Sequence, residues 1–137
     1  MNLNEVVEIY VRLLEGGEVL VPVKAVCIEA NLFRIIENQY IDQEDATSIW
    51  EFFPDEIVEC ELKDDIWIAK KLIESSMPDR NLYRLIFRIV ESAGNIEIKE
   101  SDEMRESSKE LFKRDDIIQK QHPTVKRWMD KHETVVS

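Results

Sequence analysis

Four carboxylates close together in the sequence, Glu59, Glu61, Asp64 and Asp65, are the clearest candidates for chemistry in this chain. Paired carboxylates can serve as general acid and base, or can bind Mg²⁺ or Ca²⁺. The same spacing also arises on any strand whose solvated face is acidic, and no glycine-rich metal loop accompanies these residues. We therefore favour a solvated surface and keep a divalent-metal enzyme as the second alternative function.

No other pattern in the sequence compels catalysis. There is no P-loop, dinucleotide fingerprint, nucleophile elbow or zinc-binding helix. The histidines, His122 and His132, lack partners at metal-ligand spacing, and we expect both to be exposed. Cys27 and Cys60 lie in apolar, strand-like runs without a histidine partner, which is typical of buried, reduced core residues. We expect no catalytic residue, no metal site and no cofactor.

The acidic residues are concentrated in the first half of the chain. Residues 1–65 hold 16 acidic and 4 basic side chains, whereas residues 66–137 hold 13 and 14, and the whole chain has a net charge of −11. A strongly negative face disfavours nucleic acid and anionic membranes, and it raises the encounter rate with a basic partner. We therefore expect a basic protein partner.

The predicted contact residues for that partner are acidic side chains from loops and strand faces of the first half, together with one tryptophan that sits off the neighbouring apolar stripe. They are Glu37, Asp42, Glu44, Asp45, Asp55, Glu56, Glu59, Glu61 and Trp67.

The first half reads as β-structure. Apolar residues alternate over 6–14, a Gly16-Gly17 turn follows, and 19–28 returns as a strand that Pro22 places at an edge or a bulge. Two further strands are expected at 32–36 and 57–62. The segment 37–48 is polar and reads as a surface loop, and Trp50, Phe52 and Phe53 are expected to plug the sheet.

The second half changes to a helical period. We expect Asp64-Asp65 to start a helix with Ile66, Ala69, Leu72 and Ile73 buried, and a second helix over 79–93 with Leu82, Leu85, Ile86 and Ile89 buried. Further helices are expected from Ser101 and around Val125 to Met129. The predicted fold class is α+β, a four-stranded antiparallel sheet or small barrel with three to four helices packed on one side. The segments 1–63 and 64–137 should pack as one compact domain.

Two features of the helical half remain open. Arg80, Arg84 and Arg88 form a basic ridge that can bind an anion or pair within the fold, and we favour pairing within the fold. Trp128 can belong to the core or to an interface.

A set of short motifs in the first half resembles a family of small uncharacterised bacterial proteins. The motifs are Tyr10-Val11-Arg12-Leu13-Leu14, Pro22-Val23 with Ala25, Phe33-Arg34-Ile35, Trp50-Glu51-Phe52 with Pro54, and Val58 with Cys60-Glu61. The resemblance covers residues 7–62. The chain departs from the family at Leu20-Val21, where an aromatic often precedes the proline, and at Asp55, where glycine is usual. The resemblance implies a compact β-domain and carries no activity.

These observations favour a non-enzymatic acidic protein that neutralises a basic partner, as a bacterial immunity protein neutralises a nuclease-like toxin domain. The alternative is a self-associating structural or regulatory module, a homodimer for example, that uses Trp67, Trp128 or an open sheet edge. The N-terminus lacks the pattern of a secretory signal, and the longest apolar stretch, 19–28, is too short for a membrane helix. We therefore expect a cytoplasmic protein that binds neither nucleic acid nor membrane.

Overall fold

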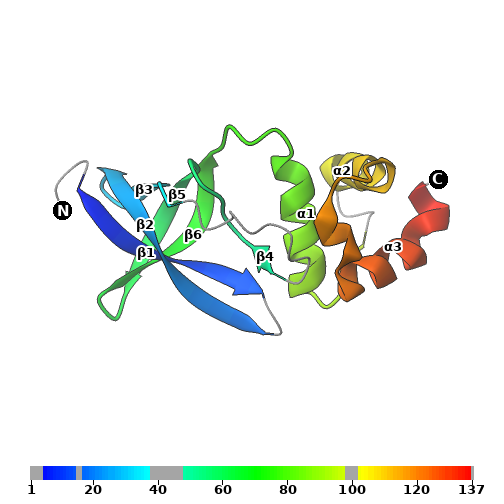
Figure 1. The fold of residues 1–137 in the computed structure, drawn as a ribbon, viewed down its shortest axis with the longest axis horizontal. Helices are drawn as coiled ribbons and strands as arrows, with labels where there is room; N and C mark the ends of the chain where they lie inside the picture. Colours follow the sequence, from blue (N-terminus) through cyan, green and yellow to red (C-terminus); the bar gives the residue numbers. More distant parts are fainter. Residues whose placement is uncertain (1–4, 15–16, 38–47, 98–101, 137) are drawn as a thin grey trace. The chain divides into compact units, whose positions relative to one another are not determined.

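The computed structural model describes residues 5–14, 17–37, 48–97 and 102–136, with side chains as far as residue 132. The chain forms two compact units (Figure 1). We call them the β unit, with described residues 5–37 (apart from the gap at 15–16) and 50–78, and the helical unit, with 48–49 and the described residues from 79 onward.

The β unit is a mixed sheet whose strands follow one another along the chain. They are β1 (Val6–Leu14), β2 (Glu18–Glu29), β3 (Leu32–Ile35), β4 (Ile49–Trp50, of which Trp50 belongs to this unit), β5 (Ile57–Lys63) and β6 (Ile66–Glu74). Five of them pair in the order β1-β2-β3-β5-β6, and β6 returns to β1 in parallel with Ile68 opposite Tyr10. The five strands thus close a barrel, and β4 is an extra strand beside β1.

The prediction of a helix starting at Asp64-Asp65 is wrong, because residues 66–74 form the strand β6. Asp64 and Asp65 have φ of +52° and +65°, and they form the two-residue turn of a hairpin between β5 and β6. Cys60 lies opposite Ala69 and Val58 opposite Leu72, because the register shifts between them. The two inward residues of β6 are therefore three apart instead of two, which is the spacing of a helix. The barrel accordingly has five strands, and β-structure extends to Glu74.

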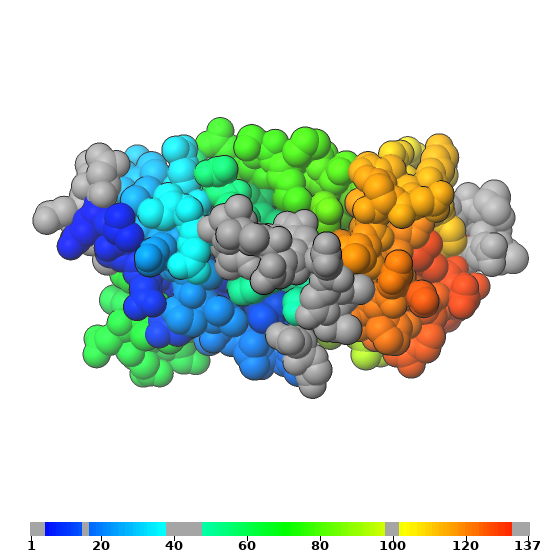
Figure 2. All heavy atoms as spheres, in the orientation of Figure 1, coloured from blue at the N-terminus to red at the C-terminus, as the bar shows by residue number. Residues whose placement is uncertain are grey.

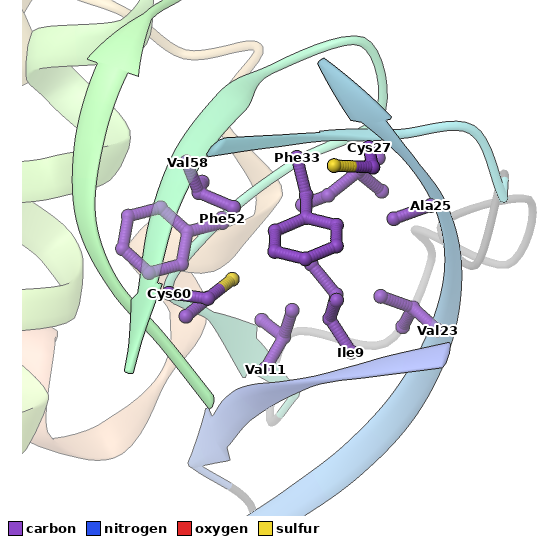
Figure 3. Close-up of a cluster of buried hydrophobic side chains, with 11 residues drawn as sticks. Ile9, Val11, Val23, Ala25, Cys27, Phe33, Phe52, Val58 and Cys60 are labelled. Carbon is purple, nitrogen blue, oxygen red and sulfur yellow. The ribbon is translucent and has the colours of Figure 1, made fainter. Parts of the chain in front are cut away.

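The barrel interior is filled by small and aromatic side chains from every strand of the closed sheet (Figure 3). The buried cluster comprises Ile9, Val11, Val23, Ala25, Cys27, Phe33, Ile35, Phe52, Val58, Cys60 and Ala69. Of the expected aromatic plug, Phe52, from the segment after β4, lies in the cluster and Trp50 packs against it, whereas Phe53 is buried but does not belong to the cluster. Leu62, the last residue of the strand expected at 57–62, is 55% exposed, because it lies near the hairpin tip where the barrel ends.

The helical unit contains α1 (Arg80–Glu91), α2 (Asp102–Lys113), the 3₁₀ turn η2 (Ile118–Gln121) and α3 (Pro123–Val136). Helix α1 confirms the predicted stripe, since Leu82, Leu85, Ile86 and Ile89 are buried. It is followed by Gly94 with φ of +81°, whose N–H donates to the carbonyl of Ile89 at 2.8 Å.

Two polar anchors fix the helices of this unit. Arg114, just after α2, forms a bidentate ion pair with Asp79 at the start of α1, with N–O distances of 2.9 and 3.0 Å. Trp128 of α3 is 1% exposed, and its indole N–H donates to the carbonyl of Ile96 at 3.0 Å. Trp128 is therefore a core residue of the helical unit. None of the helices in the described part of the chain combines the length and apolarity needed to cross a membrane.

The prediction that His132 is exposed is wrong. Its side chain is 5% exposed and stacks on Trp128, with ring centroids 4.6 Å apart. The sequence places His132 four residues after Trp128, so the two rings lie on one face of α3. His122 is half-buried, and its Nδ1 accepts a hydrogen bond from the N–H of Thr124 at 3.1 Å.

The buried thiols should be chemically inert in the folded protein. Cys27 and Cys60 are free and each is 2% exposed. Burial, assisted by the carboxylate of Glu59, raises the pKa of Cys60 from 9.0 to about 12, which reduces its thiolate fraction at pH 8 roughly a thousandfold. We expect iodoacetamide, followed by mass spectrometry, to modify both thiols in urea and neither in buffer. Rapid alkylation of Cys60 in buffer would contradict this packing.

The helical unit should lose stability on mild acidification. Burial lowers the pKa of His132, Glu97 opposes the shift and Lys131 adds to it. Because the unfolded state binds the proton more readily, the stabilisation is present above the ordinary pKa of 6.5 and is lost as the pH falls below it. Urea unfolding followed by circular dichroism at pH 7.5 and about pH 5 tests this.

The His132→Phe variant keeps an aromatic ring against Trp128 and removes the titrating group, so its unfolding should depend less on pH. The His122→Gln variant is the matched comparison, since burial also lowers the pKa of His122. Equal pH dependence in the wild-type and His132→Phe proteins would show that His132 does not carry this effect.

Candidate functional site

The structure does not bring the predicted contact residues together on one surface. Asp55, in the turn before β5, lies beside the end of β3, because its N–H donates to the carbonyl of Ile35 at 2.8 Å, and Glu37 lies just beyond the same strand. Glu61 lies toward the opposite end of β5. Asp42, Glu44 and Asp45 are outside the described residues.

Glu59 lies between the two ends of β5 and is half-exposed. Its partner in the register of the β5–β6 pair is Lys71, so its charge faces an opposite charge across the strands. Glu59 therefore contributes less to a negative surface than the sequence suggests.

Glu56 is a structural residue. Its side chain is 1% exposed, and one carboxylate oxygen accepts a hydrogen bond from the N–H of Phe53 at 2.6 Å. The backbone of Glu56 also pairs with Phe53 and with Ile35, at 3.2 and 3.0 Å. Glu56 thus holds the turn between β4 and β5 from inside and does not face a partner.

The tryptophans do not offer an exposed aromatic platform. Trp67 is half-buried and packs on Phe33, with ring centroids 5.1 Å apart. Trp128 is inside the helical unit. Two of the surfaces named for self-association are therefore largely used for packing.

The β unit instead gathers exposed carboxylates at the end of the barrel where β1 starts. Because β6 runs parallel to β1 with Ile68 opposite Tyr10, the Asp64-Asp65 turn that precedes β6 lies toward the start of β1, which carries Glu5 and Glu8. Figure 1 shows the beginning of β1 and the β5–β6 turn at the same end of the barrel.

The turn between β2 and β3 belongs to the same end. The carbonyl of Asn31 in this turn accepts a hydrogen bond from the N–H of Cys60 at 2.8 Å, which places Glu29 toward the half of β5 that carries Glu61. We call this set of exposed side chains the acidic rim. It consists of Glu5, Glu8, Glu29, Glu61, Asp64 and Asp65.

The acidic rim also exposes aliphatic side chains. Val6 is 57% exposed and Leu62 is 55% exposed, and each lies in the sequence directly beside rim carboxylates. Lys24 lies opposite Glu8 in β2 and offsets its charge as Lys71 offsets that of Glu59, and Lys63 is a second base on the hairpin, so the six carboxylates of the rim outnumber the two bases that the register identifies. The rim therefore combines a strong negative charge with apolar contact area, as the surfaces of many protein interfaces do.

The four carboxylates of the divalent-metal alternative, Glu59, Glu61, Asp64 and Asp65, do not form a ligand set. Within the described part of the chain, no group of three or more His, Cys, Asp or Glu side chains is arranged to hold a metal ion. Glu59 faces Lys71, Glu61 faces Ile68, and Asp64 and Asp65 lie in the turn. These four carboxylates contribute charge and not a converging coordination site.

The basic ridge on α1 is partly used inside the protein. Arg80 and Arg88 both have interaction partners, and Arg84 is exposed. A shallow hollow of about 60 Å³ beside Arg84 and Arg88 is also lined by Glu103 of α2, whose charge opposes an anion there. The ridge therefore does not form a well-built anion site.

Sequence reasoning missed Glu5, Glu8 and Glu29. Each is an ordinary acidic residue in its own strand, and only the pairing of β1, β2, β5 and β6 brings the three to one end. The parallel contact between β6 and β1 was not foreseen, because β6 was read as a helix.

Comparison with known proteins finds no matching protein family, no matching curated protein and no matching solved structure.

The structural role of Glu56 can be tested by removing its carboxylate. Replacing Glu56 by alanine removes the acceptor for the N–H of Phe53 in a buried site, and we expect a loss of about 2 kcal/mol in the free energy of unfolding. Glu59→Ala is the matched control on a half-exposed acid nearby and should cost less than about 0.5 kcal/mol. Equal losses in urea unfolding would refute a special role for Glu56.

Proposed function

We propose that this protein is a non-enzymatic acidic binding protein that neutralises a basic protein partner, in the manner of a bacterial immunity protein acting on a nuclease-like toxin domain. The acidic rim is the proposed contact surface, and the bacterial cytoplasm is the proposed place of action.

The observation that carries the proposal is the convergence of six exposed carboxylates, from three separate segments of the chain, on one end of the barrel. A field of one sign accelerates the encounter with an oppositely charged surface. It also orients that surface before contact. Nuclease domains present basic clefts to their anionic substrates, so the rim has the charge needed to occupy such a cleft.

The exposed aliphatic side chains of the rim supply apolar contact area, which stabilises the complex more than exposed ion pairs do. Solvent-exposed ion pairs contribute little to affinity, typically below about 1 kcal/mol each, whereas buried apolar area lowers the dissociation rate. Val6 and Leu62 are the side chains that a partner would cover at the rim. The proposed partner therefore presents aliphatic or aromatic side chains between its lysines and arginines.

One observation supports the alternative function, self-association. Val19 and Leu20 on β2 are 46% and 41% exposed and adjacent, so a second copy can cover them. Sedimentation at increasing concentration separates this function from the binding of a different protein.

The rim is tested by neutralising three of its carboxylates together, as Glu61→Gln, Asp64→Asn and Asp65→Asn. Asparagine tolerates the positive φ at residues 64 and 65, so the turn should be kept. The partner is first captured on the tagged protein from its native host at low salt and identified. Its association rate should fall about tenfold in the triple variant at low salt, and less at higher salt.

The matched control carries the same change of net charge in the helical unit, as Glu110→Gln, Asp115→Asn and Asp130→Asn, all at exposed positions. Its association rate should fall much less. If both triple variants bind equally well, the rim is not the contact surface. If no basic protein is captured at low salt, the proposed function itself fails.

A further inference from the structure

A second site in the β unit is built around a hollow that the proposed function does not use. The hollow has a volume of about 290 Å³ and is lined by Arg34, Asp55, Ile57, Glu74, Ser75 and Ser76. Arg34 and Asp55 lie on β3 and on the turn before β5, and Glu74 ends β6. The volume is near the lower limit of ligand pockets, which suits a molecule of amino-acid size.

The strand register fixes the walls of the hollow. Arg34 pairs with Ile57 across β3 and β5, and Ile57 pairs with Glu74 across β5 and β6. Arg34 and Glu74 are thus two strand spacings apart, about 10 Å between Cα atoms, with Ile57 between them. Ile57 is 8% exposed and provides an apolar floor.

The charged walls are not used within the fold. Among the described residues that line the hollow, Arg34, Asp55 and Glu74 are all exposed, and none takes part in an ion pair in the structure. Ser75 is engaged through its hydroxyl, which accepts the N–H of Met77 at 3.1 Å. One cation and two carboxylates therefore surround an apolar floor without neutralising one another.

The backbone at Asp55 is fixed by hydrogen bonds in a conformation that costs conformational energy. Its φ is +68°, a conformation that disfavours residues with a side chain. The next residue, Glu56, is buried and bonded to Phe53, and the N–H of Asp55 is bonded to Ile35. The turn that presents the Asp55 carboxylate at the hollow is thereby preorganised, which lowers the cost of ordering on binding.

We propose that this hollow binds a free basic amino acid of the lysine type. Such a molecule carries one carboxylate for Arg34 and two ammonium groups for Asp55 and Glu74, so its charges match those of the site in number and sign. Its methylene chain can lie on Ile57 while the charged ends stay hydrated. The proposal is independent of the acidic rim and of the basic protein partner.

The test is a titration of the full chain with L-lysine at constant ionic strength, followed by amide chemical shifts in two-dimensional NMR. We expect saturable shifts at residues 34, 55 and 74–76, with a Kd on the order of 1 mM. Norleucine, which lacks the second ammonium group, should produce much smaller shifts. Absence of saturable shifts at roughly tenfold higher lysine concentration overturns the proposal.

Variants separate a built site from general attraction of cations. Arg34→Gln and Glu74→Gln should each raise the Kd for lysine several-fold, whereas Glu29→Gln, at the other end of the barrel, should leave it unchanged. Cadaverine, which has the two ammonium groups and no carboxylate, should bind more weakly than lysine, and Arg34→Gln should not weaken its binding further, because the guanidinium of Arg34 repels a dication. Equal binding of cadaverine and lysine overturns the proposal, because the site would then attract cations only.

Discussion

The parallel pairing of β6 with β1 is the contact on which the architecture of the β unit depends. Five strands that follow one another and alternate in direction bring the first and last strands together in parallel, so the sheet can close only through this pair. The pair is short, with Tyr10 opposite Ile68 in the register. Closure removes the free edges of the sheet, which are otherwise sites of aggregation. It also decides which turns share an end, and therefore where the acidic rim forms.

The second constraint is the buried carboxylate of Glu56. A charged group inside a protein costs free energy unless it is hydrogen-bonded, so its retention needs a structural reason. Its bond to the N–H of Phe53 fixes the turn that leads into β5. The same turn positions Phe52 in the barrel core and Asp55 at the hollow. One internal polar contact thus connects the packing of the barrel with the geometry of its surface.

Much of the fold could be predicted from local pattern alone. The alternation in β1, β3 and β5, the aromatic Phe52 in the core and the stripe of α1 all appear where the sequence indicates them. The failure at β6 has a specific cause, because its bulge spaces Ala69 and Leu72 three residues apart and imitates a helix. The prediction that His132 is exposed was wrong for a different reason. Its burial results from packing against Trp128, and a polar residue on a thin apolar stripe gives no local sign of that.

The candidate site was less predictable than the fold, because the number of acidic residues in a sequence does not show which of them are exposed, or which face a basic residue, on the surface. Of the predicted acids, Glu56 is buried in the turn before β5 and Glu59 faces Lys71. Glu5, Glu8 and Glu29 join Glu61 only through strand register. Composition therefore indicated the sign of the surface potential but not its location.

The acidic rim and the hollow also differ in how they would recognise a ligand. The rim acts through a field that extends about a Debye length, whereas the hollow acts through side chains in contact with its ligand. Salt should therefore weaken recognition at the rim mainly by slowing encounter, while recognition at the hollow depends on shape and on the order of its charges.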